Sequence, residues 1–219
     1  MYSGLNNSLT LDTRRVQLDS SSRCNLRCPG CSRTKWLADG LVGDVRDMKM
    51  EHFKALVRHE NKLDILSYNL SVSDPIFSGV FIEQLEYINT LKHRPRINIS
   101  TNGSGRKEAW WLKLAKLLGP KDAVEFAIDG LEDTNHLYRV NSDWNSIMLG
   151  IKTLRANWPG RIGWRYVIFE HNYHQVADAK KLAEQLGMRR FRPVVGDNRT
   201  PDEMLLRSKT WEDIANDIS

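Results

Sequence analysis

Three cysteines, the only ones in the chain, lie within eight residues at Cys24, Cys28 and Cys31. Thiolates at this C-x3-C-x2-C spacing can bind three irons of a [4Fe–4S] cubane and leave the fourth iron without a protein ligand. An open metal position can hold and activate a small molecule. A zinc knuckle is the competing interpretation, but structural zinc sites use four ligands, and the nearest spare donors, His52 and His59, have no telling spacing. We therefore predict one [4Fe–4S] cluster on these cysteines.

Length and composition agree with a single globular domain. The 219 residues, 41% hydrophobic and 27% charged, are enough for one core and exclude a disordered or fibrous class. No apolar stretch approaches the roughly 18–20 residues that span a bilayer, and the N-terminus lacks the basic start and apolar run of a signal peptide. An odd, bunched set of cysteines argues against disulfides. We expect a cytoplasmic protein with no membrane partner.

The formal net charge of +5 is spread over short basic pairs and triplets. A nucleic-acid interface would need a longer basic run or patterned aromatic residues, so the sequence argues against a nucleic-acid partner. An acidic electron-donor protein or a phosphate-bearing substrate is compatible with this charge.

Extended runs alternate with amphipathic helical patterns along most of the chain. Helical patterns occupy residues 48–59, 80–91, 109–118, 144–156 and 176–186. The strands that they separate are predicted at residues 15–19, 65–70, 96–100, 123–128, 163–169 and 190–194.

Repeated strand–helix units predict an α/β fold with parallel strands and right-handed crossovers. Six units are too few for the closed eight-stranded barrel, so we expect an open partial (βα)6 barrel. Its core should span residues 14–196, between an N-terminal arm at 1–13 and a C-terminal tail at 197–219 with a short helix near 211–214. Chemistry in such sheets lies at the carboxyl ends of the strands.

The run CNLRCPGC, from Cys24 to Cys31, resembles the signature loop of the radical S-adenosylmethionine (radical SAM) superfamily. The chain looks most like the branch with SPASM or twitch domains, over roughly residues 14–195. The resemblance implies that the open iron chelates S-adenosylmethionine. Relatives often have an aromatic residue where this chain has Gly30. No cysteine follows Cys31, so the auxiliary clusters of SPASM domains have no thiolate ligands here.

Two landmarks follow at the ends of the second and third predicted strands. The segment VSDP at 72–75 resembles a Gly-Gly-Glu-Pro turn, which implies that Ser73 and Asp74 receive the methionine ammonium. A simple turn cap is the alternative for Asp74. The segment STNG at 100–103 resembles a Ser/Thr-Asn-Gly stretch, which implies that Ser100 and Asn102 lie near the ribose or the methionine carboxylate.

Two further landmarks follow the fourth and fifth predicted strands. The segment AIDG at 127–130, with a Tyr-Arg pair after it, resembles the Ser-Leu-Asp-Gly region of SPASM-type relatives. The resemblance implies that Asp129 and Arg139 bind the cofactor, Arg139 through the methionine carboxylate. Asn172 matches a polar strand-end position near adenosine or substrate. His171 and His174 have no partner at ligand spacing and are interpreted as surface or helix-start residues.

The resemblance implies a radical SAM enzyme, an oxidoreductase or transferase. An external donor of the flavodoxin or ferredoxin type would reduce the cluster, and S-adenosylmethionine would break to methionine and a 5′-deoxyadenosyl radical that abstracts hydrogen from the substrate. A peptide or protein side chain is the favoured substrate. A small-molecule or nucleotide reaction and a glycyl-radical activase are alternatives within the class. A non-catalytic iron–sulfur protein is the alternative from another class.

Overall fold

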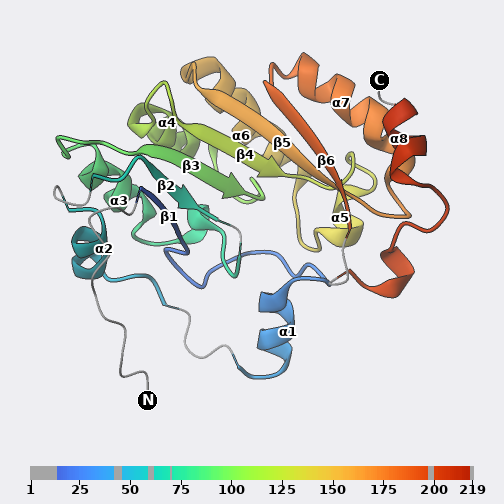
Figure 1. Ribbon diagram of the computed structural model, residues 1–219, viewed down its shortest axis with the longest axis horizontal. Helices are drawn as coiled ribbons and strands as arrows, with labels where there is room; N and C mark the ends of the chain where they lie inside the picture. Colours follow the sequence, from blue (N-terminus) through green and yellow to red (C-terminus); the bar gives the residue numbers. More distant parts are fainter. Residues whose placement is uncertain (1–13, 42–45, 59–61, 70, 197–199, 218–219) are drawn as a thin grey trace.

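Six parallel strands form one sheet in the computed structural model, which describes residues 14–41, 46–58, 62–69, 71–196 and 200–217. Neighbouring strands follow chain order, and the sheet does not close (Figure 1). The predicted α/β open partial barrel with parallel strands is therefore confirmed. The predicted arm at 1–13 lies outside the described residues. The strands are β1 (Arg15–Leu18), β2 (Ile65–Tyr68), β3 (Arg96–Thr101), β4 (Ala123–Ala127), β5 (Arg161–Ile168) and β6 (Arg190–Val195).

Helices connect the strands and cover one side of the sheet, whereas α1 lies apart from that layer (Figure 1). The three-residue 3-10 helices are η2 (Pro75–Phe77), η3 (Tyr173–Gln175) and η4 (Asp202–Met204). The α-helices are α1 (Ser32–Ala38), α2 (Met50–Leu56), α3 (Phe81–Ile88), α4 (Glu108–Leu117), α5 (Asn135–Tyr138), α6 (Trp144–Asn157), α7 (Val176–Gln185) and α8 (Trp211–Asp217).

The core lies between the sheet and its helices. In β3 every second side chain is fully buried, and these inward residues are Ile97, Ile99 and Thr101. The same alternation places Phe126 of β4 and Trp164 of β5 against the helices. Because side chains alternate across a strand, the residues between them face the opposite, concave side. That side is polar, which is unusual for a parallel sheet, where both faces are normally apolar.

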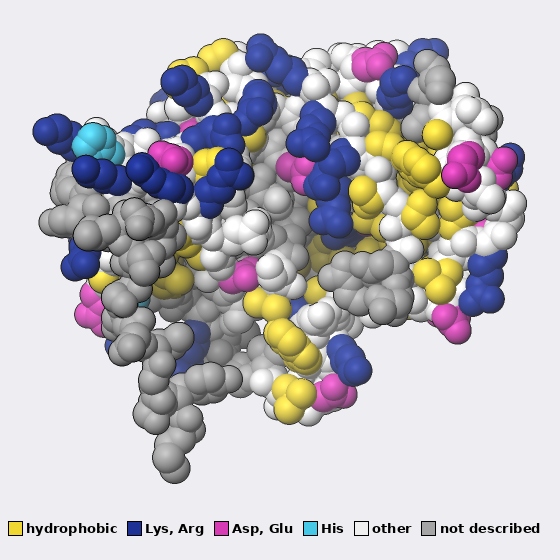
Figure 2. Space-filling model, in the orientation of Figure 1, with side chains coloured by type: hydrophobic (Ala, Val, Ile, Leu, Met, Phe, Trp, Pro, Cys, Tyr) yellow, Lys and Arg dark blue, Asp and Glu magenta, His cyan; other side chains and the backbone are white. Residues whose placement is uncertain are grey.

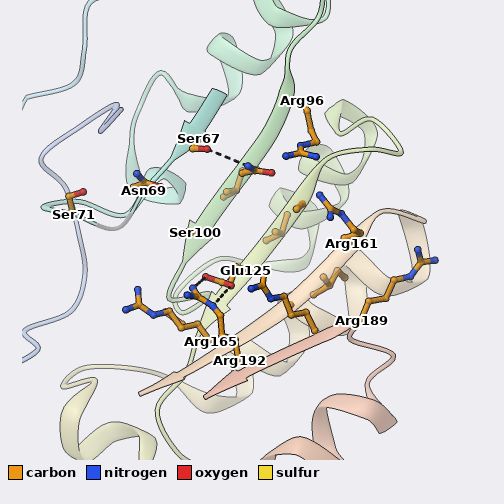
Figure 3. A pocket seen from close by; sticks show the side chains of 18 of the residues that line it. Ser67, Asn69, Ser71, Arg96, Ser100, Glu125, Arg161, Arg165, Arg189 and Arg192 are labelled. Atoms are coloured by element: carbon orange, nitrogen blue, oxygen red, sulfur yellow. Dashed lines mark hydrogen bonds and ion pairs between the residues drawn. The ribbon is translucent and has the colours of Figure 1, made fainter. Parts of the chain in front are cut away.

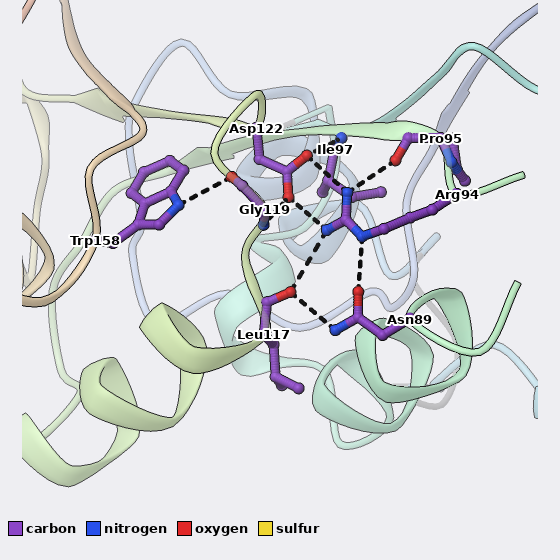
Figure 4. A network of polar contacts seen from close by, with 8 residues as sticks. All are labelled: Asn89, Arg94, Pro95, Ile97, Leu117, Gly119, Asp122 and Trp158. Carbon is purple, nitrogen blue, oxygen red and sulfur yellow. Dashed lines mark hydrogen bonds and ion pairs between the residues drawn. The ribbon is translucent and has the colours of Figure 1, made fainter.

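A polar network fixes the amino ends of β3 and β4 (Figure 4). The Asp122 carboxylate is fully buried and accepts two bonds from the Arg94 guanidinium, at 3.0 and 2.5 Å. It also accepts the backbone N–H groups of Ile97 at 2.8 Å and Gly119 at 2.7 Å. This network lies at the sheet edge opposite the strand ends at which the chemistry is predicted.

The structure adds two α-helices to the predicted elements and shifts several of the predicted ends by one to three residues. The helices α1 and α5 were not predicted, because α1 buries only Arg33 and α5 has only four residues, so neither shows an apolar period. The strand β5 begins at Arg161, two residues before its predicted start. The helix predicted near 211–214 is present as α8. In the described part of the chain, no helix combines the length and the apolar character needed to cross a bilayer.

Candidate functional site

The three cysteines lie on the loop that leads from β1 to α1. Cys31 directly precedes α1, and its N–H donates to the carbonyl oxygen of Cys28 at 3.1 Å. The Cys24 sulfur accepts the N–H of Leu26 at 3.4 Å. All three cysteines line one cavity of about 170 Å³. The loop therefore brings the three thiols to a common space without a disulfide.

The donor set fits a cluster better than a single ion. Among the described residues, no three His, Cys, Asp or Glu side chains converge on one point as the ligands of one ion do. The thiols that ligate a cubane each bind a different iron, so they surround a shared space instead. Arg33 and Arg165 also line this cavity, and Arg33 Nη1 and Arg165 Nε are buried without a hydrogen-bond partner. Buried cationic donor atoms without a partner favour an anionic group such as a thiolate-ligated cluster.

Cys24 and Cys28 are buried enough to favour the neutral thiol until a metal binds. Burial raises the pKa of the Cys24 thiol to about 11, and the Asp74 carboxylate adds to the shift. Burial also raises the pKa of Cys28, while the nearby Arg139 guanidinium acts against this rise. Coordination deprotonates a thiol outright, so iron binding should release protons at neutral pH.

The turn after β2 is fixed to the end of β3 through Asp74. Its Oδ2 accepts the N–H of Asn102 at 2.7 Å and the Thr101 hydroxyl at 3.1 Å, and its Oδ1 accepts the N–H of Ile76 at 3.2 Å. The residue is fully buried, and burial raises its pKa to about 6. Asn102 then donates through Nδ2 to Asn25 on the cysteine loop at 3.0 Å. Asp74 therefore supports the cavity wall from behind.

The end of β4 holds a second buried carboxylate. Asp129 is fully buried, and its Oδ2 accepts the Arg139 Nε–H at 2.6 Å. Its Oδ1 accepts the N–H of Val167 at 2.7 Å. Burial acts to lower the pKa of Arg139, but the charges of Asp129 and Cys28 outweigh it and raise that pKa above its ordinary value. Asn172 donates to the carbonyl oxygens of Asp129 and Val167, both at 3.0 Å.

The predicted site residues divide into two groups. Ser73, Asn102 and Arg139 line the cavity together with the three cysteines. The others are not part of this lining. The fully buried Asp74, Asp129 and Asn172 hold the strand-end loops, and Ser100 lines a larger neighbouring cavity. That the lining residues bind the cofactor stays a prediction.

Sequence reasoning missed two arginines of this cavity. Arg33 follows Cys31 by two residues, and its Nε–H donates to the carbonyl oxygen of Ser22 at 3.0 Å. Arg165 lies within β5, and it was overlooked because most of its neighbours in this strand are apolar. A usable signal was the alternation in RIGWRYVI, which places Arg161 and Arg165 on the face opposite the buried Trp164 and Tyr166.

The two histidines differ in their surroundings. His174 is exposed, as predicted. His171 is half-buried, stacks on Phe169 with ring centroids 5.4 Å apart, and has a buried Nε2 without a partner. Burial lowers the pKa of His171. The surface interpretation of His171 was therefore incomplete, because the stacking partner is not visible in sequence.

Comparison with known proteins gives a consistent result. A family model described as the Radical SAM superfamily matches residues 19–204. A curated protein from Methanothermobacter marburgensis, named a probable GTP 3′,8-cyclase, is 22% identical over 181 residues, which cover 78% of this chain and 54% of the relative. The chain thus spans about half the length of that relative.

Solved structures share the fold at low sequence identity. The Streptococcus suis protein SuiB bound to S-adenosylmethionine has a TM-score of 0.71 and 15% identity, over 93% of this chain and 45% of that one. TYW1 with a lysine-pyruvate adduct has a TM-score of 0.64 and 14% identity, over 94% of this chain and 71% of that one. The protein anSMEcpe with bound AdoMet has a TM-score of 0.65 and 16% identity, over 84% and 50%.

Proposed function

Because this chain belongs to the radical SAM superfamily, we propose that it cleaves S-adenosylmethionine reductively at a [4Fe–4S] cluster held by Cys24, Cys28 and Cys31. The cofactors of this enzyme class are the cluster and S-adenosylmethionine, and solved relatives contain the latter. One observation carries the proposal: the three thiols line a single cavity together with Ser73, Asn102 and Arg139, three of the predicted polar residues. When bound, the cluster supplies a low-potential electron and an open iron, so that S-adenosylmethionine yields methionine and a 5′-deoxyadenosyl radical that abstracts hydrogen from the substrate.

In this proposal, the residues that line the cavity bind S-adenosylmethionine and orient it. Asn102 and Ser73 line the cavity with neutral polar side chains, a type of group that suits a ribose or an amino-acid head group, and they also bond to Asn25 and Asp19. Arg139 presents a cation there, with its Nε held by Asp129, which suits a carboxylate. The buried carboxylates of Asp74 and Asp129 position these residues, and we assign them no direct contact with the cofactor.

The reaction partners belong to the proposal as well. An external one-electron donor of the flavodoxin or ferredoxin type reduces the cluster. Two substrate classes are supported by relatives: one SuiB structure is bound to a precursor peptide, and the curated relative is named for GTP. A peptide side chain is the substrate class that the sequence resemblance favours. A nucleotide is the class that the cavity chemistry described below favours.

The test is anaerobic reconstitution followed by reduction with dithionite. We expect about four irons per chain, as a three-thiolate cubane requires, and slow formation of 5′-deoxyadenosine and methionine from S-adenosylmethionine, measured by liquid chromatography and mass spectrometry. Replacing any one of Cys24, Cys28 or Cys31 by Ala should abolish both.

The matched control is His52→Ala, which removes the spare donor that a zinc knuckle would recruit. The His52 side chain is 69% exposed and lies 3.7 Å from Glu51, so its loss should change neither iron content nor turnover. Tight binding of one zinc that depends on His52 would overturn the cluster. A fully clustered protein that neither binds nor cleaves S-adenosylmethionine would overturn catalysis and favour an electron-transfer or scaffold role.

A further inference from the structure

A cavity of about 980 Å³ opens on the concave side of the sheet, next to the proposed cluster site. Ser32, Ser71, Val72 and Arg165 line both spaces, so the two are adjacent. Lys and Arg side chains gather over this face with few acidic ones among them (Figure 2). The arginines that line the cavity are Arg96, Arg161, Arg165, Arg189, Arg190 and Arg192.

Strand alternation turns these arginines toward the cavity. In β5 the residues Arg161, Gly163 and Arg165 face it, while the residues between them are buried in the core. Gly163 adds no side chain and lies opposite Arg190 in the strand register. Figure 3 shows the Arg96 and Arg161 side chains in the same part of the cavity, although they come from β3 and β5. The cations therefore converge from three strands.

In the described lining, the positive charges of the arginines are not balanced by an equal number of carboxylates. Its one carboxylate in the described chain is Glu125, which binds Arg192 at 2.7 Å (Figure 3). Arg165 lies directly across from Arg192 in the register, and like charges at such positions repel. The Nε atoms of Arg96 and Arg165 are buried without a hydrogen-bond partner. Buried, unpartnered donors of this kind are costly, and an anionic ligand would satisfy them.

An aromatic residue completes the lining. Trp36 of α1 borders the same cavity, and 42% of its surface is exposed although it is a large apolar side chain. An indole face is a stacking platform for a nucleobase. The planar guanidinium fork matches phosphate oxygens in pairs. A cavity of this size also lies in the range of small-molecule sites, of order 300–1,000 Å³.

We propose that this cavity binds a nucleotide with two or more phosphates as the substrate of the radical reaction, with the phosphates on the arginines and the base against Trp36. The substrate role rests on the proposed function, whereas the binding itself does not. Because Arg165 lines both cavities, a molecule bound here would lie beside the cluster site. A peptide would be recognised differently, because it needs side-chain pockets and backbone partners more than a dense cluster of cations.

The test is equilibrium binding of ATP, GTP and inorganic tripolyphosphate to the reconstituted full chain by isothermal titration calorimetry. Arg96→Gln combined with Arg161→Gln should weaken all three by about ten- to a hundredfold or more, since charge-assisted contacts are lost. Trp36→Leu should weaken the two nucleotides by about fivefold or more and leave tripolyphosphate unchanged, since only the nucleotides stack. Arg14→Gln combined with Arg207→Gln is the charge-matched control, because these two side chains are 59% and 67% exposed and outside the lining.

The readouts separate this inference from the proposed function. Uncoupled formation of 5′-deoxyadenosine by the wild-type chain, with no nucleotide added, measures the proposed function alone. If the wild-type chain cleaves S-adenosylmethionine but binds no nucleotide, the inference is overturned and the proposed function stands. If nucleotides bind as described but no cleavage occurs, the site stands and its substrate role is overturned. Tighter binding of poly-glutamate or of an RNA oligonucleotide than of any nucleotide would also overturn the inference.

Discussion

The buried ion pair between Asp129 and Arg139 provides a stringent test of how the cavity wall is built. Arg139 Nε lies 2.6 Å from Asp129 Oδ2, and the two side chains are 14% and 0% exposed. Asp129→Asn would leave the guanidinium with little solvent and no counter-charge. Breaking a buried pair on one side typically costs about 3–5 kcal/mol, so we expect a loss of that size in the free energy of unfolding.

The double variant measures the coupling energy between the two side chains. Asp129→Asn together with Arg139→Gln removes both charges, so no buried charge is left unpaired. Its cost should be smaller than the sum of the two single variants by about 2 kcal/mol or more, in the upper range for residues in direct contact. The comparison pair is Glu125–Arg192, which has a similar distance of 2.7 Å but side chains 24% and 36% exposed. Arg192→Gln should cost about 1 kcal/mol or less, because solvent screens this pair.

The assay is urea unfolding of cluster-free protein under anaerobic, reducing conditions, followed by circular dichroism and by tryptophan fluorescence. Coinciding transitions from the two probes would justify a two-state analysis by linear extrapolation. A cost below about 1 kcal/mol for Asp129→Asn, or a coupling energy near zero, would show that this pair behaves like a surface contact. The interpretation of Asp129 as a buried positioning residue for Arg139 would then be wrong.

Three other variants test separate parts of the structure. Gly130→Ala should unfold the turn before Arg139 at lower urea, because Gly130 has a φ of +137° and a Cβ there would collide with Thr134 Oγ1. Asp122→Ala should lower the free energy of unfolding by about 3–5 kcal/mol without changing cofactor cleavage, since it breaks a buried pair and Asp122 does not line the cluster cavity. Burial raises the pKa of Asp74 from 3.8 to about 6, so its contribution to stability is present below pH 4 and is lost as pH rises through 6. Between pH 4 and 7 the wild type should lose about 3 kcal/mol relative to Asp74→Asn, measured by unfolding at each pH.

The fold was predictable because its signals are local and repeated. Alternating strand and helix patterns predicted the number and direction of the six strands. Elements without an apolar period were missed. The position of α1 depends on the cysteine loop before it and on the hydrogen bond from Arg33 to the carbonyl oxygen of Ser22. Such a contact leaves no periodic signal in the sequence.

The site was predictable only in outline. The spacing of the cysteines indicates a cluster, and the strand-end rule places the polar motifs near it. Which atoms face the cavity depends on packing that no motif encodes: Asp74 turns its carboxylate to the backbone of Asn102, whereas Ser73 beside it lines the space. The arginines of the concave face could have been found, because they alternate with buried residues in β5 and with the half-buried Phe191 and Pro193 in β6. That these arginines lie near Arg96 of β3 could not be predicted, because it depends on how the strands are arranged in the sheet.

Asp74 and Asp129 have the same structural role, and this role leads to a prediction about side-chain length. Each carboxylate is fully buried at a strand end and accepts the backbone N–H of a neighbouring segment, from Asn102 at 2.7 Å and from Val167 at 2.7 Å. If Asp74 met the cofactor directly, Asp74→Glu would improve binding by restoring the acid of the resembling turn. Because Asp74 instead holds Asn102 and Ile76 at once, one extra methylene in this closed space should destabilise the chain by about 1–3 kcal/mol. Affinity for S-adenosylmethionine, measured by calorimetry on the clustered protein, should fall with it, and Asp129→Glu should behave alike. Tighter binding by Asp74→Glu at unchanged stability would move Asp74 from the supporting wall to the cofactor.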